Sequence, residues 1–120
     1  MPDVVIVYTT WPDADTAEAV GAQAVADQLA ACANIEAPMR SVYRWQGAVE
    51  RSDEVAMTLK TTDEAAAALC AFILERHPYE LPCILAWTVE AELSHGDYLD
   101  WVAEQVVAPA IDPAPDIERA

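Results

Sequence analysis

The side chains of this sequence that are best suited to metal binding are two histidines and three cysteines. Copper(II) favours imidazole and oxygen ligands, whereas copper(I) favours thiolates. His77 stands at the expected end of a helix, directly before Pro78, where a neutral imidazole would face a cleft. The alternative is a histidine that ends its helix by hydrogen-bonding a backbone carbonyl group. His95 is predicted to be a loop residue near the start of the last helix, with metal binding as its alternative.

The three cysteines are Cys32, Cys70 and Cys83, an odd number without Cys-x-x-Cys spacing. In a cytosolic chain such cysteines are expected to be reduced rather than paired in disulfides. A buried cysteine behaves as a small hydrophobic residue. Packing is therefore the predicted role of each.

A second group of side chains has the chemistry of a ligand cleft, and its members are Tyr43, Trp45, Glu54, Lys60, Tyr79 and Tyr98. The aromatic members have packing between subunits as their alternative, because aromatic residues anchor interfaces. Lys60 is the only lysine, and a buried lysine must be paired or have a lowered pKa. We predict that it pairs with Glu54 or Asp53 at a subunit cleft. Such a pair would be structural or would hold an anionic ligand.

The sequence contains no arrangement that is typical of an enzyme. It has no Ser-His-Asp signature and no His-Glu-x-x-His motif, and its three glycines cannot form a phosphate-binding loop. We therefore predict a binding protein without catalytic activity.

The charge balance is strongly acidic, with six Lys and Arg against 21 Asp and Glu and a net charge of −15. Nucleic-acid binding needs a basic patch and is not expected. The acidic surface favours solubility and attracts cations weakly. The apolar runs are too short to span a membrane. Because Met1-Pro-Asp3 leads directly into an apolar run without a basic segment, we predict no signal peptide and a cytoplasmic location.

The element that must position these residues is a long hairpin, whose arms Ser41–Trp45 and Ala48–Thr62 flank a Gln46-Gly47 turn. In its second arm apolar side chains alternate with polar ones, which predicts a strand. A glycine in the loop supplies the positive φ of a tight turn. Taken over the whole stretch from Cys32 to Thr62, the two strands would have roughly a dozen residues each, beyond the usual five or six, so we expect the excess to pair with another copy of the chain. Pro38 is expected to mark a bulge or a break.

The rest of the chain predicts alternating strands and helices. Asp13 or Asp15 caps the first helix, where Gly21 allows close packing on a sheet, and a capping box of Thr61 and Glu64 starts the second. The predicted strands are Val4–Thr10, the two arms of the hairpin and Cys83–Glu90, and the predicted helices are Ala14–Ala31, Ala65–Arg76 and Tyr98–Val107. This order gives an α+β domain over residues 1–107 with a ferredoxin-like β-α-β-β-α-β fold and a C-terminal helix. Residues 108–120 form a Pro-, Ala- and acid-rich tail that is predicted to be disordered.

Five segments together resemble the CutA1 divalent-cation tolerance family in order and spacing over residues 3 to 106. They are Leu29-Ala-Ala-Cys-Ala-Asn-Ile35, Ser41-Val-Tyr-Arg-Trp-Gln-Gly47, Lys60-Thr61, His77-Pro-Tyr-Glu80 and Gly96-Asp-Tyr-Leu-Asp-Trp101. The resemblance implies a ferredoxin-like fold and a homotrimer in which the long hairpins pair with neighbouring subunits. It also implies a cytosolic protein of the metal-ion response that binds copper(II), and no enzymatic activity. The architecture is similar to that of the PII signalling trimers.

The resemblance makes His77 and Cys32 the candidate metal ligands, because they stand in the family's His-Pro-Tyr and Ala-Ala-Cys motifs. Two positions depart from some relatives, since Arg76 replaces a histidine and Thr9 replaces a cysteine, and both changes predict weak copper binding. Other divalent cations are also expected ligands, and no metal is required for folding. Two alternatives are a PII-like sensor that binds a small anion at its subunit clefts, and a rigid interaction scaffold.

Overall fold

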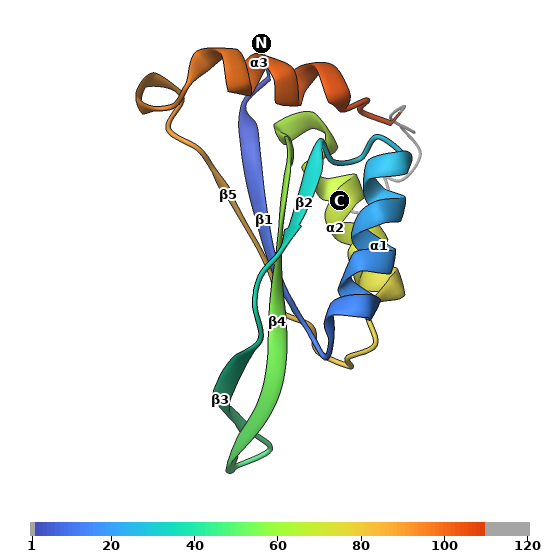
Figure 1. The fold of residues 1–120 in the computed structure, drawn as a ribbon, viewed down its shortest axis with the longest axis vertical. Helices are drawn as coiled ribbons and strands as arrows, with labels where there is room; N and C mark the ends of the chain where they lie inside the picture. Colours follow the sequence, from blue (N-terminus) through green and yellow to red (C-terminus); the bar gives the residue numbers. More distant parts are fainter. Residues whose placement is uncertain (1, 110–120) are drawn as a thin grey trace, which may run out of the picture.

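The computed structural model describes residues 2–109 and contains an antiparallel β-sheet with three α-helices (Figure 1). The strands are β1 (Val4–Trp11), β2 (Cys32–Ile35), β3 (Met39–Trp45), β4 (Ala48–Thr62) and β5 (Ile84–Thr88). The helices are α1 (Ala14–Ala26), α2 (Asp63–Arg76) and α3 (Gly96–Gln105), with a 3-10 turn, η1, at Ala91–Leu93. Helices α1 and α2 cover one face of the sheet, and α3 crosses its end. The predicted α+β class is confirmed, and the ferredoxin-like assignment stays a prediction.

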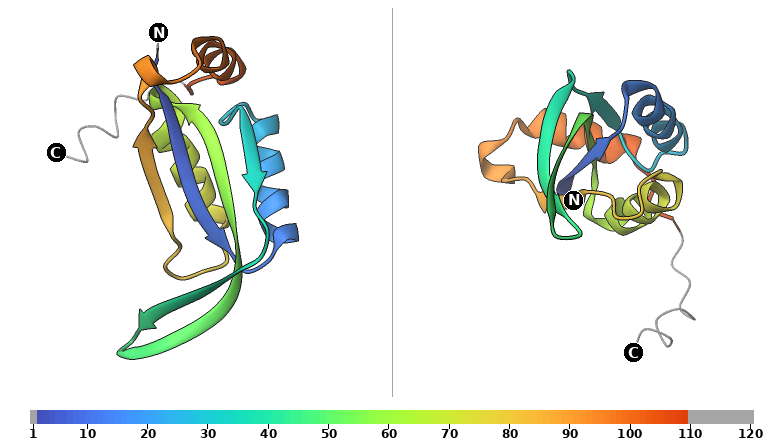
Figure 2. Two further views of the ribbon diagram at one scale, coloured as in Figure 1. Left: turned by 60° about the vertical axis from the view of Figure 1, so that its left-hand side comes forward. Right: turned by 90° about the horizontal axis from the view of Figure 1, so that it is seen from below.

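The sheet has the order β2-β4-β1-β5, and β3 also pairs with β4. Thus β2 and β3 form one arm, which is broken between Ile35 and Met39 as Pro38 predicted. Ile35 pairs with Met57 and Met39 pairs with Glu54, so this arm advances four positions while β4 advances three. The extra residue is what a bulge introduces, and it bends the hairpin away from the sheet (Figure 2).

The outer half of the hairpin is a two-stranded ribbon. Strand β1 ends at Trp11, which pairs with Val55, so the part of β4 before Val55 pairs only with β3. At the tip Gln46 and Gly47 have φ of 49° and 84°, which confirms the predicted turn. A lone two-stranded hairpin is marginally stable in water. Another surface beside the ribbon would therefore stabilise it.

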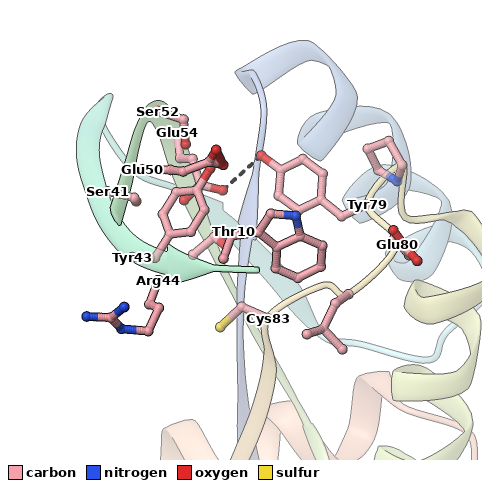
Figure 3. A pocket seen from close by; sticks show the side chains of 13 residues that line it. Thr10, Ser41, Tyr43, Arg44, Glu50, Ser52, Glu54, Tyr79, Glu80 and Cys83 are labelled. Atoms are coloured by element: carbon pink, nitrogen blue, oxygen red, sulfur yellow. Dashed lines mark hydrogen bonds between the residues drawn. The ribbon is translucent and has the colours of Figure 1, made fainter. Parts of the chain in front are cut away.

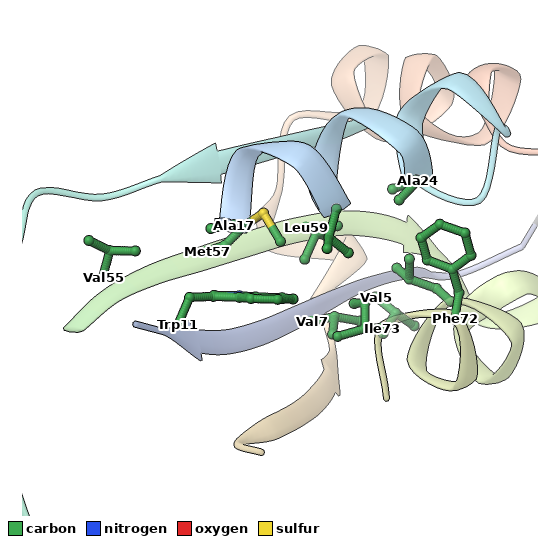
Figure 4. Packing of buried hydrophobic residues seen from close by; sticks show 13 residues of the cluster. Val5, Val7, Trp11, Ala17, Ala24, Val55, Met57, Leu59, Phe72 and Ile73 are labelled. Carbon is green, nitrogen blue, oxygen red and sulfur yellow. The ribbon is translucent and has the colours of Figure 1, made fainter. Parts of the chain in front are cut away.

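The core lies between the sheet and helices α1 and α2 (Figure 4). The predicted alternation in β4 is confirmed, because Val55, Met57 and Leu59 are all buried and belong to this core. The opposite face of the sheet is open. There Leu85 and Trp87 are 58% and 50% exposed, although both are large apolar residues.

The close packing predicted at Gly21 of α1 is confirmed. A Cβ atom at this position would lie 2.7 Å from Met57 Sδ and 3.1 Å from Ala33 Cβ. Helix propensity favours alanine over glycine by roughly 0.5–1 kcal/mol, but overpacking a core costs about 1–3 kcal/mol. We expect Gly21→Ala to lower the free energy of unfolding by roughly 0–2 kcal/mol in urea denaturation. The exposed Ala22 is the control. If Gly21→Ala stabilised the protein by as much as Ala22→Gly destabilised it, the close contact would be refuted.

Several predicted boundaries are wrong. Helix α1 begins after the Asp13 cap as predicted, but it ends at Ala26 rather than Ala31, because Gln28 takes a φ of 59° and turns the chain out of the helix. The Thr61 capping box does not form. Helix α2 starts at Asp63, and the Thr61 hydroxyl instead donates to the Leu29 carbonyl oxygen at 2.7 Å.

The C-terminal elements are also shifted from their predicted limits. Strand β5 is shorter than the predicted 83–90, and α3 runs over 96–105 rather than 98–107. The predicted tail lies outside the described residues, apart from residues 108 and 109. Within residues 2–109, none of the helices has the length and apolar character needed to cross a membrane.

Candidate functional site

A pocket of about 770 Å³ opens between the hairpin and the loop that follows α2 (Figure 3). Side chains alternate across a strand, so residues at every second position share a face. The register pairs Tyr43 with Glu50 and Met39 with Glu54, which places both glutamates on the pocket face of β4. Tyr79 and Glu80 enter the pocket from the loop, and so does Cys83, which is the residue directly before β5. The predicted cleft residues Tyr43, Trp45, Glu54 and Tyr79 are therefore brought together.

Glu54 is the most buried carboxylate of the pocket, with 8% of its surface exposed. Its Oε2 atom accepts a hydrogen bond from the Tyr79 hydroxyl at 2.8 Å. Among the described residues the only ion pair joins Arg76 to Glu75, so Glu54 has no cationic partner there. Arg44 also borders the pocket, but its guanidinium lies 3.5 Å from the Gly47 carbonyl oxygen. A nearly buried negative charge thus faces the cavity.

Glu54 also affects its neighbours. Burial raises the pKa of Tyr79, and the hydrogen bond to Glu54 and its charge raise it further. Burial and the same carboxylate raise the pKa of the Cys83 thiol. Both groups are therefore neutral at pH 7. A cation that offset the charge of Glu54 would make both groups more acidic.

His77 lies behind this pocket, with both ring nitrogens engaged. Nε2 lies 2.7 Å from the Thr10 carbonyl oxygen, and Nδ1 accepts the Tyr79 backbone N–H at 3.1 Å. Because a carbonyl oxygen only accepts, Nε2 carries the proton. The ring also stacks on Trp11, with centroids 4.1 Å apart. Burial lowers the pKa of His77, although the Thr10 carbonyl and Glu54 act in the opposite direction.

The structure therefore gives His77 the carbonyl-bonding role. A metal could use Nδ1 only after the hydrogen bond from Tyr79 had opened. Metal ligation by His77 stays an untested prediction.

Lys60, Tyr98 and Cys32 lie outside this pocket, near the place where β2 pairs with the C-terminal part of β4. Lys60 Nζ donates to Asn34 Oδ1 at 2.7 Å, and Cys32 Sγ lies 3.7 Å from the Tyr98 hydroxyl. Within one chain Lys60 pairs with neither Glu54 nor Asp53, and the predicted pair at a subunit cleft stays an untested prediction. Glu54 lies six positions away along the same strand, which is about 20 Å.

The two candidate metal ligands are not brought together. His77 contacts Thr10 near the end of β1, whereas Cys32 is paired with Lys60 near the other end of the sheet. The ammonium group of Lys60 opposes a cation beside Cys32, and metal ligation by Cys32 likewise stays untested. No group of three potential metal-ligating side chains is present within residues 2–109.

Sequence reasoning missed Glu50 and Cys83. Glu50 precedes Glu54 by four positions, and the period of two in β4 was a sufficient signal for placing both on one face. Cys83 was expected only to pack, because nothing local in the sequence shows that the chain directly before β5 reaches the same pocket as the hairpin. Together the pocket residues form a carboxylate-rich site that suits a cation better than an anion.

Comparison with known proteins finds relatives that match most of the chain. The sequence profile of the family described as CutA1 divalent ion tolerance protein matches residues 5–105. A divalent-cation tolerance protein CutA of Citrobacter koseri is 39% identical over 104 residues, covering 85% of this chain and 87% of that protein.

Solved structures are similar too. The divalent cation tolerance protein of Thermus thermophilus superimposes with a TM-score of 0.81 at 34% identity, covering 87% of this chain and 99% of that chain. A PII-like protein CutA from Nostoc sp. PCC 7120 gives a TM-score of 0.82 at 30% identity, covering 88% and 99%.

Proposed function

Because the chain belongs to the CutA1 divalent ion tolerance family, we propose that it is a cytoplasmic homotrimer that binds copper(II) and takes part in the tolerance of divalent metal ions. It acts by binding, without a catalytic step. Other divalent cations compete for the same carboxylate-lined pocket.

The observation that carries this proposal is the carboxylate of Glu54, nearly buried at the pocket wall and without a cationic partner among the described residues. Carboxylate oxygen is an accepted ligand of divalent cations. The Cys83 thiol, which lines the same pocket, becomes a ligand when a metal displaces its proton. A neighbouring copy supplies the remaining ligands.

The proposed trimer also explains two uncovered surfaces of the single chain. The ribbon of β3 and β4 lacks a third strand, and the open sheet face exposes Leu85 and Trp87. Association covers both. We expect light scattering in dilute buffer to give about 39 kDa, three times the 13.0 kDa of one chain. The mass of a monomer would contradict this assembly.

The test of copper binding is calorimetric titration of the trimer with copper(II), comparing Glu54→Gln with Glu104→Gln. Both substitutions remove one negative charge, but Glu104 lies on α3 outside the pocket. We expect Glu54→Gln to weaken binding about tenfold or more, as losses at metal sites do, while Glu104→Gln leaves it unchanged. Equal effects would show that copper is attracted only by the overall charge.

A second candidate function is anion sensing. Lys60 supports it, because its ammonium group is held by Asn34 beside the Tyr98 ring, 6.0 Å from the centroid. The Nostoc relative is described as PII-like. The carboxylate pocket opposes an anion, so this function would use the Lys60 group. Loss of anion binding in Lys60→Gln but not in Glu54→Gln would favour it.

A further inference from the structure

The pocket is larger and less polar than a metal ion requires. Its volume of about 770 Å³ falls in the range of small-molecule sites, about 300–1,000 Å³. Aromatic rings form much of its lining, with Tyr43 and Trp45 from the hairpin and Tyr79 from the loop, and Leu81 adds apolar surface. A hydrated divalent cation makes no use of such walls. The lining therefore fits a ligand that has an apolar body.

The charged side chains of the pocket determine which sign of charge this ligand carries. Glu50, Glu54 and Glu80 bring three carboxylates to the lining. Figure 3 shows the Arg44 side chain directed away from the Glu54 carboxylate, while the Tyr43 and Tyr79 rings lie on either side of it. Glu54 Oε2 is used by Tyr79, and no hydrogen bond from a described residue reaches Oε1. A ligand with a positive charge is favoured here, and an anion is repelled.

The spacing of the carboxylates further limits the class of ligand that fits the pocket. Glu50 and Glu54 are four positions apart on one face of β4, so their Cα atoms are about 13 Å apart. Ser52 lies between them on that face, and Tyr43 pairs with Glu50 across the ribbon. Acidic groups are thus separated along the strand by a distance that one small ammonium ion does not bridge. A chain with several ammonium groups joined by methylene segments does so.

We propose that this pocket binds an aliphatic polyamine. One ammonium group occupies the free side of the Glu54 carboxylate, between the Tyr43 and Tyr79 rings, where cation–π attraction adds to the ionic contact. The methylene segments lie on Trp45 and Leu81, and a second ammonium group meets Glu50. The inference rests on the same pocket that the proposed function assigns to a divalent cation, so the two cations compete for Glu54.

The experiment is calorimetric titration of the trimeric full chain with spermidine in 0.15 M salt, where screening weakens attraction to the distant acidic surface. Tyr43→Leu removes the ring and keeps an apolar side chain. We expect it to weaken spermidine binding about twofold to tenfold, and to leave copper(II) binding unchanged, because only the polyamine uses the ring. Glu54→Gln weakens the binding of both ligands, and Glu104→Gln weakens the binding of neither.

The polyamine inference is overturned if spermidine does not bind, or if Tyr43→Leu and the control bind it as tightly as the unmodified protein. It is equally overturned if Glu54→Gln and Glu104→Gln lose the same affinity. Because Tyr43 lies on the hairpin, each variant is first checked for trimer mass, and Glu50→Gln replaces Tyr43→Leu if that variant dissociates. Copper binding without spermidine binding refutes this inference alone, and spermidine binding without copper binding refutes the proposed metal ligand alone.

Discussion

Replacing Trp11 with alanine is expected to lower the free energy of unfolding by about 3–5 kcal/mol, the range for large aromatic residues in a core. Trp11 is fully buried at the end of β1 and belongs to the main core. Its indole Nε1 donates to Thr9 Oγ1 at 2.6 Å, and that hydroxyl in turn donates to the Met57 carbonyl oxygen at 2.8 Å. The substitution therefore leaves a cavity and deprives Thr9 of a donor.

The loss of the indole ring should also disturb the pocket, because the Trp11 ring stacks on His77. Urea denaturation at one fixed protein concentration measures the stability, since the stability of the proposed trimer would depend on concentration. Trp101→Ala is the matched control, as this tryptophan on α3 is 41% exposed. A loss from Trp11→Ala no larger than that of the control would show that Trp11 is not a core residue.

The protein is also expected to lose stability as the pH falls below about 6.5, the ordinary pKa of histidine. Burial holds the pKa of His77 below that value in the folded chain. Between the two pKa values the unfolded chain binds a proton that the folded chain does not. The free energy of unfolding then falls by up to about 1.4 kcal/mol for each pH unit, and the decline levels off below the folded pKa.

Urea denaturation between pH 7.5 and 5.5 tests this dependence, because ordinary carboxyl groups stay ionised over that range. Glu54 is the charged group that opposes the shift from β4. His77→Gln removes the titrating ring and should flatten the slope, whereas His95→Gln, at an exposed position, should keep it. A slope that survives in His77→Gln would assign the pH dependence to another group.

Much of the fold was readable from local patterns. Strand β4 has the predicted limits Ala48–Thr62, because its apolar alternation ends at a glycine turn on one side and at a helix start on the other. Pro38 marked the break in the facing arm. The end of α1 was not readable, since the residue that turns the chain is Gln28, with positive φ, rather than a glycine.

The site was predictable from local patterns only within the hairpin. The positions of Tyr43 and Glu54 follow from the face that the two strands of the hairpin share. The partner of Lys60 depends instead on the register of β2, which places Asn34 opposite Thr58 and within reach of the ammonium group. Cys83 reaches the pocket through the position of β5, and such non-local contacts have no signature in the neighbouring residues.

The length of the ribbon, formed by β3 and the part of β4 before Val55, can be changed in defined steps. Since β3 and the outer part of β4 pair only with each other, cross-strand pairs near the tip can be removed without disturbing the core. Removing one pair turns everything distal to it onto the opposite face, whereas removing two pairs restores the original orientation. The arm can therefore be shortened or lengthened in steps of about 6.6 Å while its tip keeps the same orientation.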